Sequence, residues 1–260
     1  MIDFSFSLSE LEYFLLILTR VTCFIYIAPF FGMTNTPARI KIGLGVFVSV
    51  LLYYAIVPKQ YAEYDTIFGY AMIVVKEAAV GLIIGLGAQV CMSITSLAGR
   101  LIDMEIGLAM ANQMDPTTQE QSTISGIYLQ YFIMLILIVT GFYEYLLRAI
   151  AETFILIPVN EAVFRYDSLV DNVVTFLTGY VLVGFQICMP IFASIIVLNA
   201  VLGILAKVSP QMNMFAVGMQ LKILVGLSIL FLTVSLLPYS AEAVFTQMKV
   251  IIVSLVESMM

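Results

Sequence analysis

The chain contains no histidine and no tryptophan among its 260 residues, and it has only three cysteines. Without histidine there is no Ser-His-Asp or Cys-His catalytic arrangement, no H-E-x-x-H zinc motif and no haem ligation by imidazole. Cys23, Cys91 and Cys188 lie far apart inside apolar runs, so we expect buried free thiols and no disulfide framework. The sequence also has no Walker A loop. These absences predict a protein that is not an enzyme and that holds no cofactor and no metal.

Charge is scarce as well: charged residues make up 11% of the chain, hydrophobic residues 62%, and the net charge is −6. A soluble domain has about 25% charged and about 45–50% apolar residues. The apolar excess is more than a core of this size can bury, so lipid or apolar protein must cover it. The negative charge excludes nucleic acid as a partner, because nucleic acid requires a clustered basic face. The composition therefore predicts an all-α membrane protein in contact with membrane lipid, organised as one domain over residues 1–260.

Apolar runs of helical length recur along the chain. A span takes about 20 apolar residues, so these runs predict about six helical segments. The run at 42–57 is marginal in length, and the run at 173–205, which contains Pro190, is either one kinked helix or two shorter helices. A final stretch at 244–256, interrupted by Lys249, is typical of an amphipathic terminal helix. The six runs are residues 11–31, 42–57, 67–97, 127–142, 173–205 and 215–237.

Positive charges follow alternate runs, whereas acidic residues gather in the other connections. In a six-span arrangement the positive-inside rule then places the connections at 32–41, 98–126 and 206–214 in the cytoplasm. We therefore expect a multi-pass membrane protein.

Several charges lie inside the apolar runs, where each costs about 2.5–3.5 kcal/mol at a lipid-facing midpoint. Glu12 and Arg20 are eight residues apart and share one helical face, whereas the adjacent Lys76 and Glu77 point in different directions. We expect such charges to be buried against partner helices. For Arg20 and Lys222, snorkelling of the side chain from a span end is an equally good interpretation.

Small and acidic residues mark two further features. Gly81 and Gly85 form a G-x-x-x-G pair, which allows close approach of another helix. Asp103 and Glu105 diverge by about 200° on a helix, so they do not form a catalytic acid pair. We expect these two carboxylates to be solvated or to form surface salt bridges.

Four stretches in a fixed order carry a resemblance to one family. They are Arg20–Pro29 with Pro37–Leu44, Ala98–Pro116, Leu198-Asn199 with Gly203 and Lys207–Asn213, and Phe215–Gly226. In these stretches, in length and in span order, the chain resembles the FliR family, the flagellar type III export-gate membrane protein, which is related to the SctT family of injectisomes. The residues from Gly218 to Gly226 favour the flagellar branch.

The resemblance implies a role that composition does not show. FliR-like proteins join FliP-like and FliQ-like subunits in a helical export-gate complex of the flagellar basal body, together with FlhB- and FlhA-like export components. Unfolded flagellar proteins pass through this complex. Its helices form bent hairpins that are lifted largely out of the bilayer plane, so a count of six simple spans would mislead.

The resemblance also implies a pore plug in the segment from about Gly107 to Ser122. The methionines are adaptable enough to seal an irregular constriction, the alanines keep the segment thin, and the Asp-Pro pair ends any helix there. The alternative is a plain cytoplasmic connection between helices. The proposed plug residues are Gly107, Ala109, Met110, Ala111, Asn112, Gln113, Met114, Asp115 and Pro116.

Four basic residues are candidates for subunit contact or gating: Arg20, Arg100, Lys207 and Lys222. Lys207 opens the turn Lys207–Asn213, which needs no function if it only joins two helices. An autonomous membrane transporter is the competing function, because broken helices and intramembrane charges are transporter features too. That interpretation favours two related halves, and none is visible in the sequence.

Overall fold

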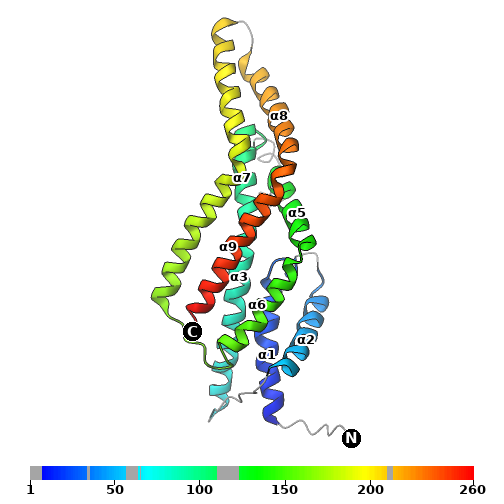
Figure 1. Ribbon diagram of the computed structural model, residues 1–260, viewed down its shortest axis with the longest axis vertical. Coiled ribbons are helices and arrows are strands. Elements are labelled where there is room, and N and C mark those ends of the chain that lie inside the picture. The colour runs from blue at the N-terminus through cyan, green and yellow to red at the C-terminus, as the bar shows by residue number, and fades with distance from the viewer. Residues whose placement is uncertain (1–7, 34–35, 57–63, 65, 110–122, 210–212) are drawn as a thin grey trace. The chain divides into compact units, whose positions relative to one another are not determined.

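The computed structural model describes residues 8–33, 36–56, 64, 66–109, 123–209 and 213–260. Within these ranges every regular element is helical and no strand occurs, which confirms the all-α membrane fold. The elements are α1 Leu8–Ile27, α2 Ala38–Ala55, α3 Ile67–Ile106, α5 Ile124–Val139, α6 Phe142–Leu156, α7 Tyr166–Val208, α8 Met214–Leu232, the 3-10 helix η1 Thr233–Leu236, and α9 Leu237–Glu257 (Figure 1).

The expected number of six simple spans is wrong for the described residues. Four helices are long and apolar enough to cross a membrane, or up to five if α5 and α6, which are bent by 72° relative to each other, form one broken span. The run at 11–31 does not qualify because α1 carries Glu10, Glu12 and Arg20. The runs at 215–237 and 244–256 merge into one apolar helical stretch, Ala216–Glu257.

Two helices are much longer than their apolar runs. α3 has 40 residues and continues through the charged residues after position 97, and α7 is one helix of 43 residues with Pro190 inside it. This settles the open choice for the run at 173–205 in favour of one helix. At about 1.5 Å per residue, α7 rises about 64 Å, roughly twice the thickness of a bilayer's hydrocarbon core.

The terminal helix begins earlier than expected. α9 starts at Leu237, directly after the 3-10 turn, and not near position 244. Pro238 lies in the first turn of α9, where its missing N–H leaves no helical hydrogen bond unmade. Hydropathy alone does not detect this start, because the 3-10 turn interrupts the helix without a polar loop.

The chain divides into two compact units, here called the first and the second unit. The first unit comprises Met1–Cys91, Gly141–Phe176 and Gln247–Met260, and the second comprises Met92–Thr140 and Leu177–Thr246. The organisation of residues 1–260 as a single domain stays a prediction.

In the first unit, α1 packs against α2 and α3 at glycine positions. A Cβ on Gly45 of α2 would lie 2.6 Å from Cγ2 of Thr22, and a Cβ on Gly81 of α3 would overlap the carbonyl oxygen of Arg20. Gly85, one turn further on, meets the carbonyl oxygen of Phe24 in the same way, at 3.0 Å. The predicted close approach at the G-x-x-x-G pair is therefore confirmed, with α1 as the partner helix.

In the second unit, the C-terminal part of α7 and α8 run side by side as a hairpin (Figure 1). A buried apolar cluster lies where α3, α5, α7 and the α8–α9 region meet. Its members are Ala98, Ile102, Ile106, Leu129, Cys188, Ile191, Ile195, Leu230 and Leu237.

Candidate functional site

The segment predicted to plug a pore lies between α3 and α5 in the sequence, and the helix ends on both sides of it belong to the second unit. α3 stops at Gly107, whose φ of +92° is a left-handed conformation that favours glycine. The N–H of Gly107 still donates to the carbonyl oxygen of Asp103 at 3.0 Å. Ala109 is described, whereas Met110, Ala111, Asn112, Gln113, Met114, Asp115 and Pro116 lie outside the described residues.

The start of α5 is held by a carboxylate of α3. Both side-chain oxygens of Asp103 lie 3.3 Å from the backbone nitrogen of Ser125, which donates its N–H to them. Thr123 is the N-cap of α5 and its hydroxyl oxygen accepts the N–H of Gly126 at 3.2 Å. Because the first N–H groups of a helix have no partner within the helix, these two side chains supply acceptors for them, and the negative charge of Asp103 suits the positive helix end.

Asp103 is fully buried, so the expectation that it is solvated is wrong. The contact with α5 helps to bury the Asp103 side chain, and the spacing of residues within α3 does not predict this contact. Gly99, one turn earlier on α3, faces Gly126 so closely that a Cβ on Gly99 would overlap the backbone of Gly126. Because Gly99 and Gly126 have no side chains, the backbones of α3 and α5 can approach closely here, and the Asp103 carboxylate reaches the N–H of Ser125.

α8 lies beside the end of α3. A Cβ on Gly226 would lie 2.5 Å from Cγ1 of Ile106, and a Cβ on Gly107 would lie 4.0 Å from Cγ of Met219. The structure therefore brings together two of the sequence motifs, the one that ends in the predicted plug and the one from Phe215 to Gly226.

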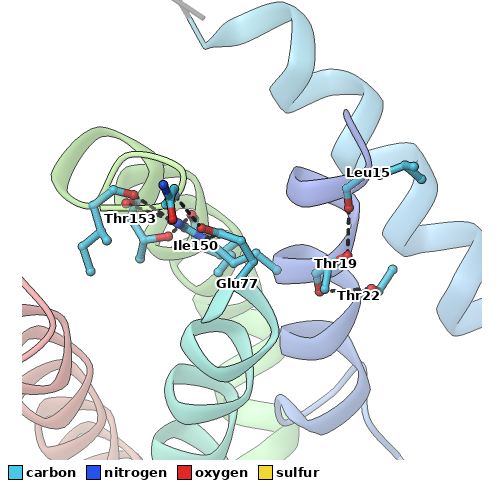
Figure 2. A network of polar contacts seen from close by, with 9 residues as sticks. Leu15, Thr19, Thr22, Glu77, Ile150 and Thr153 are labelled. Atoms are coloured by element: carbon cyan, nitrogen blue, oxygen red, sulfur yellow. Dashed lines mark hydrogen bonds and ion pairs between the residues drawn. The ribbon is translucent and has the colours of Figure 1, made fainter. Parts of the chain in front are cut away.

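A second polar centre lies in the first unit, where Arg20 of α1 pairs with Glu77 of α3. The Nε of Arg20 lies 2.5 Å from Oε2 of Glu77, and both side chains are fully buried. Figure 2 shows Glu77 directed from α3 toward Thr153 and Ile150 of α6. The alternative in which Arg20 snorkels to a span end is wrong, because the guanidinium has a partner inside the unit.

The same guanidinium closes the C-terminal end of α6. Nη1 of Arg20 donates to the carbonyl oxygens of Thr153 at 3.2 Å and Ile157 at 2.9 Å. The carbonyl oxygen of Thr153 also accepts the N–H of Ile157, the C-cap of α6, and a cation suits the negative end of a helix. The guanidinium carbon lies 4.3 Å from the ring centroid of Phe154, and Oε1 of Glu77 accepts the N–H of Asn160 at 3.0 Å. One ion pair thus joins α1, α3 and α6.

Glu12 has partners of its own near the start of α3. Its Oε1 accepts the hydroxyl of Tyr64 at 2.5 Å, and its backbone carbonyl accepts the hydroxyl of Tyr70 at 3.2 Å. The hydrogen bond to the Glu12 carboxylate, helped by desolvation and by that negative charge, raises the pKa of Tyr64. Glu12 and Arg20 share a helix, as expected, and each has a separate partner.

The other three predicted basic residues do not converge on a site. Arg100 and Lys207 are exposed, and Lys222 is half-buried. In the part of the chain that the structure describes, none of the three lies within ion-pair distance of an acidic group. Lys207 lies in the last turn of α7, where its charge complements the helix dipole. Roles of Arg20, Arg100, Lys207 and Lys222 in subunit contact or gating stay predictions.

The described residues offer little for chemistry. They contain no group of three or more His, Cys, Asp or Glu side chains able to hold a metal ion. All three cysteines are free, as the sequence predicted, and Cys91 and Cys188 are buried, whereas Cys23 is only half-buried. The arrangement positions helices relative to one another within each unit.

Comparison with known proteins matches most of the chain. The family model described as bacterial export proteins, family 1, matches residues 11–248. The flagellar biosynthetic protein FliR of Bacillus subtilis (strain 168) is 31% identical over 235 residues, which cover 90% of each chain. FliR of Escherichia coli (strain K12) is 24% identical over 246 residues, covering 92% of this chain and 91% of that protein. FliR of Aquifex aeolicus (strain VF5) is 28% identical over 220 residues, covering 84% and 83%.

Proposed function

The chain belongs to the FliR family of bacterial export proteins, a family of membrane components of the flagellar export apparatus, and we propose that it is a non-enzymatic core subunit of the type III export gate. In this role it assembles with FliP-like and FliQ-like subunits into a channel in the bacterial inner membrane, within the flagellar basal body. FlhB-like and FlhA-like components serve the same channel, and unfolded flagellar proteins pass through it.

The observation that carries this proposal is the length of exposed apolar helix. Large apolar side chains are exposed along the whole of α7, from Val170 near its start through Leu182 and Val197 to Val208 at its end. A helix of 43 residues rises about 64 Å, whereas lipid tails cover about 30 Å. Neighbouring protein is the remaining cover for this surface, as expected of a subunit inside a larger assembly and not of an autonomous transporter.

We include a closed-state plug in the same proposal, formed by the segment from about Gly107 to Ser122. Support comes from the anchored ends of this segment. Gly107 stops α3, and Asp103 with Thr123 fixes the start of α5. A segment held at both ends has a limited reach, and its two methionines are adaptable enough to fill an irregular constriction.

Deletion of residues 109–114 in the assembled gate tests the plug. We expect co-purification with the FliP-like and FliQ-like subunits to be unchanged, while cells that carry the gate become permeable to ions and small dyes. A matched variant, Met110→Ser with Met114→Ser, keeps the length of the segment and separates the methionines' contribution from that of chain length. Unchanged permeability in the deletion variant would show that this segment does not seal the closed pore.

Assembly is tested separately by co-expression with FliP-like and FliQ-like proteins of the same genome and gentle detergent extraction. The gate proposal expects a stable complex that contains this chain. A partner-free species that folds alone and takes up solutes in liposomes would instead establish the transporter function.

A further inference from the structure

A cavity in the second unit lies beside interruptions in two long helical stretches. It has a volume of about 260 Å³, and its walls come from α3, α5, α7 and the α8–α9 region. Pro190 of α7 lines it, and because proline has no N–H, the carbonyl oxygen of Gln186 loses its usual helical donor there. The 3-10 helix η1 lines it through Thr233 and Leu236. The cavity therefore lies where two helical stretches both depart from regular α-helical hydrogen bonding.

The interior of this cavity is apolar. Its wall includes buried aliphatic side chains such as Ile191 and Leu237, which are 3% and 4% exposed. Two hydroxyls also line it, but Thr233 and Ser240 each donate to a carbonyl oxygen of their own helical stretch. An empty space of this size leaves its walls without contacts, and an apolar cavity takes up apolar molecules in preference to water.

The cavity wall lies in the middle of the two longest apolar helical stretches that the structure describes. Residues 186–191 line it from α7, and residues between 230 and 243 line it from Ala216–Glu257. The hydrocarbon of a bilayer covers about 20 residues of a helix. Any stretch of that length taken from Ala216–Glu257, and nearly any taken from α7, includes residues of the wall. Wherever these helices cross a bilayer, the cavity therefore reaches the depth of the hydrocarbon.

We propose that this cavity holds the end of an acyl chain from a bilayer phospholipid. Leu236 and Tyr239 in its wall are 45% and 72% exposed, so the cavity is open to the surface on that side. An unbranched hydrocarbon chain fits a narrow apolar space and restores the dispersion contacts that an empty cavity lacks. Such a chain fills the second unit whether or not the export-gate proposal holds.

Photo-cross-linking in nanodiscs tests the proposal. The full-length protein, with the subunits that co-purify with it, is placed in phosphatidylcholine whose acyl chain ends in a diazirine, and mass spectrometry locates the adducts after illumination. We expect adducts on Ile191 and Leu237, which line the cavity but are buried from lipid outside it. Val197, 64% exposed on α7, reports ordinary contact with lipid. Ile195, fully buried and outside the cavity wall, is expected to stay unlabelled.

A cavity-filling variant sharpens this test. Ala243 is a half-buried residue of the wall, so Ala243→Phe occupies the space from within. We expect adducts on Ile191 and Leu237 to be lost while labelling of Val197 is unchanged. The matched control is Ala193→Phe, at an exposed residue of α7 outside the wall, and it is expected to keep the wild-type pattern. Equal labelling of Leu237 in Ala243→Phe and in the wild type overturns the proposal.

The wild-type pattern decides the proposal even if Ala243→Phe does not fold. Labelling of Val197 without Ile191 and Leu237 overturns it, because lipid then reaches the helix surface but not the cavity. Labelling of none of the three also overturns it, since protein then covers α7 or α7 lies outside the bilayer. Equal labelling of Leu237 and Ile195 overturns it as well, because the probe would then reach buried residues without regard to the cavity. Failure of the complex to contain FliP-like and FliQ-like subunits would refute the export-gate proposal and leave these outcomes unchanged.

Discussion

Each unit has a buried apolar interior, but the buried charged groups inside the two units have different kinds of partner. In the first unit, the Arg20–Glu77 ion pair joins three helices and is fully enclosed. In the second unit, an apolar cluster around Ile102 and Ile191 fills the interior. Its buried carboxylate, Asp103, is matched by a backbone N–H.

This difference predicts unequal responses to substitution. A buried ion pair adds little net stability, because removing two charges from water costs about as much as their attraction returns, but loss of one partner leaves an uncompensated charge. An apolar cluster loses stability in proportion to the contacts removed. The first unit is thus expected to be intolerant of single changes at its centre, whereas the second is expected to respond gradually.

The largest effect is expected for Glu77→Ala in the first unit. Arg20 would remain enclosed without a counter-charge, and breaking a buried pair in this way costs about 3–5 kcal/mol. The free energy of unfolding, measured by denaturant titration of the purified complex in mixed micelles, checks this value.

The double variant Arg20→Met with Glu77→Leu sharpens this test. It removes both charges and replaces them by apolar groups, so it is expected to be less destabilised than Glu77→Ala alone. Lys76→Ala, at the half-buried neighbour of Glu77, serves as the control and is expected to be nearly neutral. A double variant that is worse than the single one would mean that the hydrogen bonds of Arg20 to α6 matter more than the ion pair.

The sequence predicts part of this comparison. The all-α membrane fold, the free cysteines and the close approach at Gly81 and Gly85 all follow from composition and local spacing. Glu77 and Arg20 are recognisable as charges inside apolar runs, where they need a partner. Their pairing is not, because 57 residues separate them and only the packing of α1 on α3 brings them together.

The errors have a common physical origin. The six-span count treats each apolar run as one helix, whereas α3 continues through its charged end and α9 follows α8 after a single 3-10 turn. The expectation that Asp103 is solvated is wrong for a similar reason. Asp103 of α3 accepts an N–H at the start of α5, and this contact between distant segments cannot be recognised in the sequence of α3 alone. Helix ends and caps between distant segments depend on packing that hydropathy does not represent.

A smaller loss of stability is expected when alanine replaces a glycine at a contact between helices. This substitution can be tested in both units. Gly81→Ala in the first unit and Gly99→Ala in the second place a methyl group against backbone atoms that cannot move separately from their helices. Overpacking of this kind costs about 1–3 kcal/mol. Denaturant titration of the two variants measures whether the units tolerate it equally.

Gly203→Ala on α7 is the matched control for these variants. No atom lies within 4 Å of a Cβ built at Gly203, so alanine is expected to be neutral or to stabilise the helix by about 0.5–1 kcal/mol through its better helix propensity. Destabilisation at Gly203 equal to that at Gly99 would show that these costs arise from helix backbone effects and not from the contacts between helices.

The smallest effect is expected at the edge of the first unit, for Tyr64→Phe. The neutral Tyr64 hydroxyl donates to Glu12, and this raises the pKa of Tyr64. The hydrogen bond therefore contributes stability in full below the ordinary tyrosine pKa of about 10, and the contribution is lost as the pH rises through the raised value. Melting temperatures of the wild type and the variant should differ slightly at pH below that range and converge above it. Tyr54→Phe, at an exposed tyrosine, provides the control. A difference for Tyr64→Phe that widens with rising pH would contradict the assignment, since the phenolate cannot donate to Glu12.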